Sequence, residues 1–266
     1  MKAMIFAAGL GTRLKPITDR MPKALVPVDG KPLIEHVARK LRNAGFEEAV
    51  VNVHHFADMV EEWTRKQDWM KFSISDERAM LLETGGAVLH ARKLLEGCGN
   101  FLIHNVDIFT NADLADFASK RRTDAIATLL VSRRKTSRYF LFDPRTMRLC
   151  GWTNVNTGET IMADASIAAQ DCLMLGFSGI HIMSEKIFPL MEEYVRTMGI
   201  SDNDGAGAKF AIRDFYLWAA ACHPIYGVDV PDFKMIDVGK IDSLEAVSKW
   251  LEFELGDSGT AIGTRE

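Results

Sequence analysis

Apolar and polar positions follow two alternating patterns through the first half of the chain. Short apolar runs predict buried strands, and apolar residues spaced three and four apart predict amphipathic helices. The first helix is the clearest, because Pro32 precedes its apolar stripe and Gly45 follows it. Strands are predicted at 1–8, 49–53, 71–74, 101–103 and 125–131, and helices at 33–41, 56–63, 87–95 and 111–121.

This succession of strand and helix predicts an α/β fold with a mostly parallel sheet flanked by helices. Right-handed crossovers place helices on both faces of such a sheet, so its strands are apolar on both sides. Ligands bind at the carboxyl ends of the strands in sheets of this kind. We therefore expect the functional residues just after strands.

The pattern changes near residue 133. Short β-like pieces at 139–142, 147–152 and 172–182 predict a small antiparallel β insertion on the sheet edge, and helical spacing returns at 185–196, 209–221 and 242–254. We expect one domain at 1–255, divided near residue 133, followed by a flexible tail at 256–266.

Charge and cysteine content exclude several functional classes. The 32 basic and 36 acidic side chains give a net charge of −4, so no global positive field favours nucleic acid or an anionic membrane. Four scattered cysteines suggest neither a disulfide framework nor a zinc site. The apolar run before Gly9 is too short for a signal peptide or a membrane span. A cytoplasmic location with reduced thiols is the simplest expectation.

A glycine turn, Gly9 to Gly11, follows the first strand and lets backbone amides approach a phosphate. Leu14 stands where a dinucleotide fingerprint needs its third glycine, and no Gly-Lys-Ser/Thr follows, so hydride transfer and a P-loop ATPase are both disfavoured. A glycine turn alone is weak evidence for any activity.

The longer string around this turn is far more specific. It comprises Ala7–Leu14 with Pro16 and Thr18, and then Pro22–Val28; further segments with a recognisable pattern are Leu82–Gly86, Asn105 with Asp107, Phe177–Ile180 and Ile236–Gly239. Together these segments resemble the signature of the sugar-1-phosphate nucleotidylyltransferases, and the short bacterial N-acetylmuramic acid-1-phosphate uridylyltransferases are the nearest group among them. The resemblance covers residues 1 to about 255 and implies one catalytic domain of Rossmann-like fold, with a nucleotide-binding half at 1–132 and a sugar-binding half at 133–255.

The resemblance implies a role for each matching residue. Arg13 and Lys23 are the expected catalytic cations, because both reactants are anionic and charge neutralisation is the main catalytic task. As isolated residues they would be read as solvated loop charges. The expected nucleotide-binding residues are Ala8, Gly9, Gly11, Thr12, Glu83, Gly85 and Gly86. The expected substrate-binding residues are Thr84, Asn105 and Gly179, although Thr84 also suits a helix cap and Gly179 a β-bulge.

Asp107 and Asp237 each follow an apolar run and are the expected ligands of Mg²⁺. This cation prefers a few carboxylates together with phosphate oxygens and water. A helix N-cap is an equally good reading of Asp237 when the motif is ignored.

Several positions depart from the family pattern. Val106 replaces a common glycine and Lys240 a common threonine, and no Glu-Lys-Pro motif is evident near residue 150, which leaves the contact to the acceptor phosphate unassigned. The basic cluster at 133–138 reads as a solvated face or as a contact for an acidic sugar.

The predicted function is Mg²⁺-dependent transfer of a nucleotidyl group from a nucleoside triphosphate to a sugar 1-phosphate. UTP and N-acetylmuramic acid 1-phosphate are the first choice, which implies a step of nucleotide-sugar biosynthesis for the cell wall. Alternatives are a mannose- or heptose-1-phosphate guanylyltransferase, a choline-phosphate cytidylyltransferase with an aromatic cage, and a non-catalytic nucleotide-sugar-sensing subunit. Homo-oligomerisation is possible, and no nucleic acid or membrane partner is expected.

Overall fold

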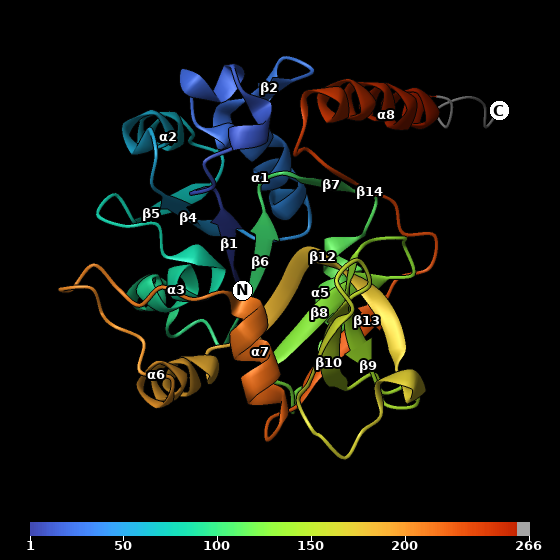
Figure 1. Ribbon diagram of the computed structural model, residues 1–266. Coiled ribbons are helices and arrows are strands. Elements are labelled where there is room, and N and C mark those ends of the chain that lie inside the picture. Colours follow the sequence, from blue (N-terminus) through green and yellow to red (C-terminus); the bar gives the residue numbers. More distant parts are fainter. Residues whose placement is uncertain (260–266) are drawn as a thin grey trace.

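The computed structural model describes residues 1–259 and shows a large central sheet with helices on both faces (Figure 1). The strands are β1 (Lys2–Phe6), β2 (Pro27–Val28), β3 (Lys31–Pro32), β4 (Glu48–Val53), β5 (Lys71–Asp76), β6 (Asn100–Asn105), β7 (Ile108–Thr110), β8 (Ala127–Ser132), β9 (Arg138–Phe142), β10 (Leu149–Asn154), β11 (Glu159–Met162), β12 (Leu173–Ser184), β13 (Ile225–Asp229) and β14 (Met235–Asp237). The helices are α1 (Leu33–Asn43), α2 (Ala57–Arg65), α3 (Glu83–His90), α4 (Arg92–Leu95), α5 (Leu114–Ser119), α6 (Ile187–Thr197), α7 (Ile212–Ala220) and α8 (Ile241–Gly259).

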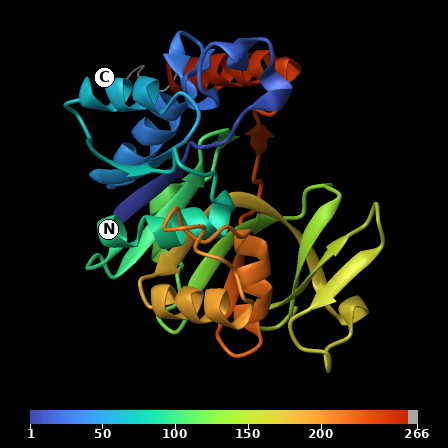
Figure 2. The same cartoon turned by 60° about the vertical axis from the view of Figure 1, so that its left-hand side comes forward.

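The sheet has a parallel part and a mostly antiparallel part, which meet at β12; the second part also contains one parallel pair, β8 with β13. Strands β5, β4, β1 and β6 are parallel neighbours, and the long β12 is antiparallel to β6. Along its length β12 also pairs with β8 and β9, and β9, β10 and β11 form an antiparallel meander. Figure 2 shows this meander projecting away from the parallel strands. The predicted α/β fold with an antiparallel insertion is confirmed.

Strand alternation divides the core between the two faces of the sheet. Ala3 and Ile5 of β1 pack in the cluster that includes α1 and α2, whereas Met4 packs in the cluster that includes α3, α6 and α7. Successive side chains of a strand point to opposite faces, so a strand covered on both sides must be apolar throughout. The continuous apolar runs of the sequence have this cause.

Some strands were not predicted from the sequence, and two helices begin at other residues than predicted. Strands β2, β3, β7 and β14 have only two or three residues, which is too short for a period to be visible. Helix α3 begins at Glu83 rather than after Gly86, and α5 begins at Leu114 because Asp113 caps it by accepting from two backbone N–H groups at 2.8 and 2.9 Å.

Helix α8 lies beside the N-terminal region in both views, where it contacts β2 and β14 (Figures 1 and 2). It extends through Gly259, so the predicted tail at 256–266 begins inside this helix, and residues 260–266 lie outside the described part of the chain. Among residues 1–259, no helix combines the length and apolar character that a membrane crossing requires.

Candidate active site

The glycine turn after β1 is shaped by one left-handed residue. Gly11 has a φ of 61°, and a Cβ there would lie 2.9 Å from Thr18 Cγ2 and 3.0 Å from Lys23 Cβ. The Thr18 hydroxyl donates to the Gly11 carbonyl at 2.9 Å, which ties the turn to the next loop. A Cβ on Gly9, by contrast, would meet no atom within 4 Å. The backbone at Gly9 is therefore open to a ligand.

A cavity of about 440 Å³ lies beside this turn, at the carboxyl ends of β1, β4 and β6. It brings together most of the residues predicted to form the site, although they span more than 90 positions of the sequence. Predicted site residues that line it are Ala8, Gly9, Gly11, Thr12, Arg13, Lys23, Glu83, Thr84, Asn105 and Asp107. The cavity therefore lies where an open α/β sheet is expected to bind its ligand.

Lys23 and Asp107 form an ion pair in this cavity. The Lys23 side chain is only 9% exposed and that of Asp107 is 21% exposed. A charge so far removed from water needs a partner, and each side chain supplies the other's. The pair holds the ammonium of Lys23 at the carboxylate oxygen that Asp107 would offer to a metal ion.

Asp237 lies next to Asp107 because β14 pairs with β7. In this short antiparallel ladder Asp237 lies opposite Ile108, and the N–H of Val238 donates to the Asp107 carbonyl at 2.8 Å. Partial desolvation and the nearby Asp107 carboxylate raise the pKa of Asp237, against a lowering influence of Lys23, Arg13 and Arg134. Two carboxylates held together in this way suit a hard divalent cation that also binds phosphate oxygens. In residues 1–259 there is no group of three or more His, Cys, Asp or Glu side chains fit to hold a metal.

The Arg13 side chain extends over the loop after β14, which contains Gly239. Its guanidinium packs on Gly239 so closely that a Cβ there would lie 2.5 Å from Nη2. The Arg13 side chain is exposed and makes no hydrogen bond or ion pair with any residue that the structure describes. Its donors are consequently available to an anionic ligand.

The first turn of α3 is arranged differently from the prediction. Glu83 and Thr84 line the cavity, but the N–H groups of Gly85 and Gly86 donate to the Phe210 carbonyl at 2.9 and 3.2 Å. The Thr84 hydroxyl accepts from the N–H of Ile212 and so caps α7. Both glycines are buried inside α3, where a Cβ on Gly86 would lie 2.0 Å from the Ala208 carbonyl oxygen. They form the wall behind the cavity rather than its surface.

Gly179 places β12 against Asn105. Its φ is 75°, it lies in an irregular stretch of the β12–β8 pairing, and a Cβ would lie 2.6 Å from Asn105 Nδ2. Glycine is required here by backbone conformation and by contact, and the bulge anticipated from the sequence is present. Gly179 therefore acts by shaping the position of Asn105, which lines the cavity.

Asn52 and Glu77 belong to the site and were not predicted. Asn52 lines the cavity, accepts from the N–H of Ala7 at 2.7 Å and donates to Glu77 Oε1 at 2.8 Å. The other Glu77 oxygen accepts from the N–H of Leu82, and burial raises the pKa of this carboxyl. This network joins the ends of three strands to the loop before α3. An asparagine inside the apolar run 49–53 is the signal that could have revealed it.

The aromatic cage of a choline-phosphate enzyme is not supported by the two residues that suggested it. Trp152 is 5% exposed, and the guanidinium of Arg213 covers its ring at 4.5 Å. Phe177 packs on Phe140 and His181 instead. In the described chain neither ring lines the cavity at the glycine turn.

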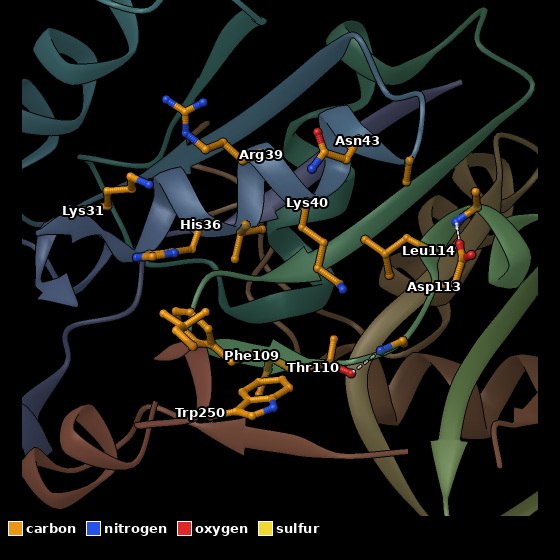
Figure 3. Close-up of a pocket in the computed structure, with 16 residues that line it drawn as sticks. Lys31, His36, Arg39, Lys40, Asn43, Phe109, Thr110, Asp113, Leu114 and Trp250 are labelled. Carbon is orange, nitrogen blue, oxygen red and sulfur yellow. Dashed lines mark hydrogen bonds between the residues drawn. The ribbon is translucent and has the colours of Figure 1, made fainter. Parts of the chain in front are cut away.

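A second cavity, of about 500 Å³, lies behind β7 and between α1 and α8 (Figure 3). Its aromatic walls are Phe109 and Trp250, and two of its basic side chains have partners: His36 bonds the Val28 carbonyl and Arg39 pairs with Glu35. This cavity shares no lining residue with the one at the glycine turn. The glycine turn and the predicted site residues Arg13, Lys23 and Asp107 belong to the latter cavity.

Comparison with known proteins agrees with this assignment. Residues 2–140, which are more than half of the chain, match the family model described as nucleotidyl transferase. The chain belongs to the nucleotidyl transferase family. Because the match covers β1 through most of β9, both the glycine turn and Asp107 lie in the part that defines the family.

Two curated relatives are each similar to less than half of the chain. The N-acetylmuramate α-1-phosphate uridylyltransferase of Caulobacter vibrioides is 50% identical over 109 residues, which are 40% of this chain and 45% of that protein. The enzyme of the same name from Neisseria meningitidis serogroup B is 41% identical over 115 residues, covering 42% and 49%. Each match thus spans about half the length of the relative.

The fold comparison extends over nearly the whole chain. A crystal structure of apo UDP-glucose pyrophosphorylase has a TM-score of 0.75 and covers 96% of this chain and 99% of its own, at 17% identity. At this identity the likeness concerns the fold alone. It shows that the antiparallel half also follows the architecture found in a nucleotidyltransferase.

Proposed function

We propose that this protein transfers a nucleotidyl group from a nucleoside triphosphate to a sugar 1-phosphate and releases pyrophosphate. The observation that carries the proposal is that Arg13, Lys23 and Asp107 line one cavity at the glycine turn, with Asp237 held beside Asp107 by the β7–β14 ladder. UTP and N-acetylmuramic acid 1-phosphate are the substrates we propose, and the two uridylyltransferases that are similar to part of the chain support this choice.

Each residue has a definite task in this reaction. The open backbone at Gly9 and the turn at Gly11 would receive the triphosphate, whose terminal oxygens suit the planar fork of Arg13. Lys23, as a point charge beside Asp107, would hold the α-phosphate and the incoming phosphate oxygen in line. Positioning and charge neutralisation of this kind provide most of the catalysis in phosphoryl transfer.

Asp107 and Asp237 would hold a Mg²⁺ ion. When bound, this ion would neutralise charge on the triphosphate. The carboxylates fit that task because the β7–β14 ladder and the hydrogen bond from Val238 to the Asp107 carbonyl hold the two residues next to each other. The base and the sugar would lie toward Glu83, Thr84 and Asn105, the polar side of the same cavity.

A substrate matrix tests this function. Purified protein with Mg²⁺ is incubated with each of UTP, CTP, GTP, ATP and dTTP against a panel of sugar 1-phosphates, and pyrophosphate is measured. We expect the highest kcat/KM with UTP and N-acetylmuramic acid 1-phosphate. If no combination of nucleotide and sugar 1-phosphate releases pyrophosphate, the proposal is rejected. A preference for GTP would instead make the protein a guanylyltransferase.

A further inference from the structure

A hollow of about 460 Å³ lies at the end of β8, away from the glycine turn. Ser132, Arg133 and Arg134 form one wall of it, and the segment 229–233 after β13 forms the other. That segment continues into β14 and ends at Asp237. One wall of the hollow thus lies a few residues before Asp237, a proposed metal ligand, in the sequence.

Arg134 is half-buried in this hollow and lacks the partners that burial calls for. Its Nη2 donates to the Phe177 carbonyl at 2.9 Å, but its Nε is buried with no hydrogen-bond partner. Within residues 1–259 no carboxylate forms an ion pair with it, whereas the exposed neighbour Arg133 pairs with Asp229 at 3.0 Å. Burial lowers the pKa of Arg134, which reflects the cost of holding its charge out of water.

Ser132 provides a second observation at the same place. Its Oγ is buried and makes no hydrogen bond. The described chain has four such unpartnered side-chain atoms, on Ser75, His104, Ser132 and Arg134, and two of the four belong to this one hollow. Leaving buried polar groups unpaired costs free energy, and a ligand with acceptor oxygens in this hollow would remove the cost for both.

The location of Arg134 relates this hollow to the sugar half of the active site. Its carbonyl partner, Phe177, is two residues before Gly179, and Gly179 packs on Asn105 in the cavity wall. The positive charge of Arg134 also acts on Asp237. An acceptor that lies between Asn105 and the aspartates would bring its acidic groups toward Arg134.

We propose that Arg134, assisted by Ser132, binds an oxyanion of the acceptor sugar phosphate. The planar guanidinium suits bidentate contact with a phosphate or a carboxylate, and both groups are present on N-acetylmuramic acid 1-phosphate. This inference rests on the proposed function and assigns the acceptor contact that the missing Glu-Lys-Pro motif leaves open. Atoms of either oxyanion would complete the hydrogen bonds of Arg134.

Kinetics with two acceptors test the assignment. The variants are Arg134→Lys, which keeps the charge but loses the fork, and Ser132→Ala; Arg138→Lys, an exposed residue of the same basic cluster, is the matched control. Loss of a charge-assisted hydrogen bond predicts that Arg134→Lys raises the acceptor KM about tenfold or more and changes the KM for UTP less than about twofold. Ser132→Ala should raise the same acceptor KM by a smaller factor, and Arg138→Lys should change neither.

The two acceptors identify the oxyanion. N-acetylglucosamine 1-phosphate carries only the phosphate, and N-acetylmuramic acid 1-phosphate carries a carboxylate as well. An equal rise in KM for both assigns Arg134 to the phosphate, and a rise confined to the second assigns it to the carboxylate. If wild type turns over and Arg134→Lys keeps both acceptor KM values, this inference alone is overturned. If wild type turns over neither acceptor with any nucleotide, the proposed function falls first and the inference with it.

Discussion

Lys23 and Asp107, which are 84 positions apart in the sequence, form an ion pair in the wall of the cavity at the glycine turn. Asp107 is also one of the two carboxylates that we propose for Mg²⁺. The pair therefore places the proposed catalytic cation in competition with the metal for the same oxygen. Binding of a metal to the free protein must displace Lys23 from Asp107 or share the carboxylate with it.

This competition predicts an unusual property of the Lys23→Met variant. Removal of the positive charge should tighten divalent-metal binding to the nucleotide-free protein by roughly threefold to tenfold, because a nearby cation opposes a second one. Turnover should fall by at least about a hundredfold, since the charge on the reacting phosphates is no longer neutralised. Mn²⁺ binding followed by electron paramagnetic resonance measures the first effect, and pyrophosphate release the second.

The matched control is Lys15→Met, because Lys15 is an exposed lysine paired with Asp19 outside the cavity. It should bind Mn²⁺ as wild type does. An unchanged Mn²⁺ affinity in Lys23→Met would mean that the Lys23–Asp107 pair does not oppose metal binding.

The aspartates themselves give a second prediction. Asp107→Asn and Asp237→Asn should each lower turnover at saturating Mg²⁺ by at least about a hundredfold, because a neutral amide is a poor ligand for a hard cation. Thermal midpoints should stay close to that of wild type for Asp237→Asn, whose side chain makes no ion pair with the described residues. Asp116→Asn, on the exposed face of α5, serves as the control. Near-normal turnover in both active-site variants would contradict the metal assignment.

The glycine turn allows two substitutions to be compared directly. Gly11→Ala should destabilise the protein by about 2 kcal/mol or more, because the residue is left-handed and the new Cβ would collide with Thr18. Gly9→Ala should leave stability within about 0.5 kcal/mol of wild type, since nothing lies within 4 Å of its Cβ. Gly9→Ala should nevertheless raise the KM for the nucleotide if the triphosphate lies against this backbone. Urea denaturation and steady-state kinetics measure the two effects, and equal stability of both variants would count against the turn geometry.

Elements with a local apolar pattern could be predicted from the sequence, whereas elements formed by contacts between distant segments could not. Strand β1 is apolar on both faces, so its run of residues is visible without any knowledge of its neighbours. The β7–β14 ladder has only three residues in each strand and forms through contacts between distant segments, so no local period reports it. Asp107 and Asp237 were recognisable as a motif, but only this ladder shows why they lie together.

Burial explains the other differences between the predicted and the observed site. Gly85 and Gly86 were expected at the ligand surface, yet their amides bond Phe210, which is 124 or more positions later in the chain and could not be anticipated. Glu77 is 1% exposed and is satisfied by Asn52 and by the backbone of Leu82. A carboxylate in a polar stretch is normally assigned to solvent, and only tertiary structure reverses that assignment.

Two buried histidines predict acid sensitivity. Burial, together with the nearby His104, lowers the pKa of His181 to about 3, and burial lowers that of His104 to about 4. In the unfolded chain these histidines have the ordinary pKa of 6.5, so below that pH the unfolded state binds protons that the native state does not bind. Their contribution to stability is therefore complete above pH 6.5 and is lost as the pH falls toward the native pKa values. Each histidine should therefore make the free energy of unfolding about 2 kcal/mol smaller at pH 5 than at pH 7.5.

The His181→Gln variant isolates this effect. It loses the hydrogen bond between His181 Nδ1 and the Tyr216 hydroxyl and should be less stable at pH 7.5, but its loss of stability between pH 7.5 and pH 5 should be smaller than that of wild type by about 2 kcal/mol. Urea unfolding at the two pH values gives both numbers. His55→Gln, which changes an exposed histidine, should keep the wild-type difference. The explanation fails if His181→Gln also keeps it.

The proposed transfer of a nucleotidyl group to a sugar phosphate depends on Arg13, Lys23, Asp107 and Asp237. It can be followed by ³¹P nuclear magnetic resonance of wild type with Mg²⁺, UTP and N-acetylmuramic acid 1-phosphate, beside the Lys23→Met variant. We predict that wild type forms the UDP-sugar and pyrophosphate in equal amounts, that omission of the sugar phosphate leaves UTP intact, and that Lys23→Met forms neither product at a comparable rate. Release of inorganic phosphate from UTP without a UDP-sugar, or equal product formation by Lys23→Met, would contradict the account.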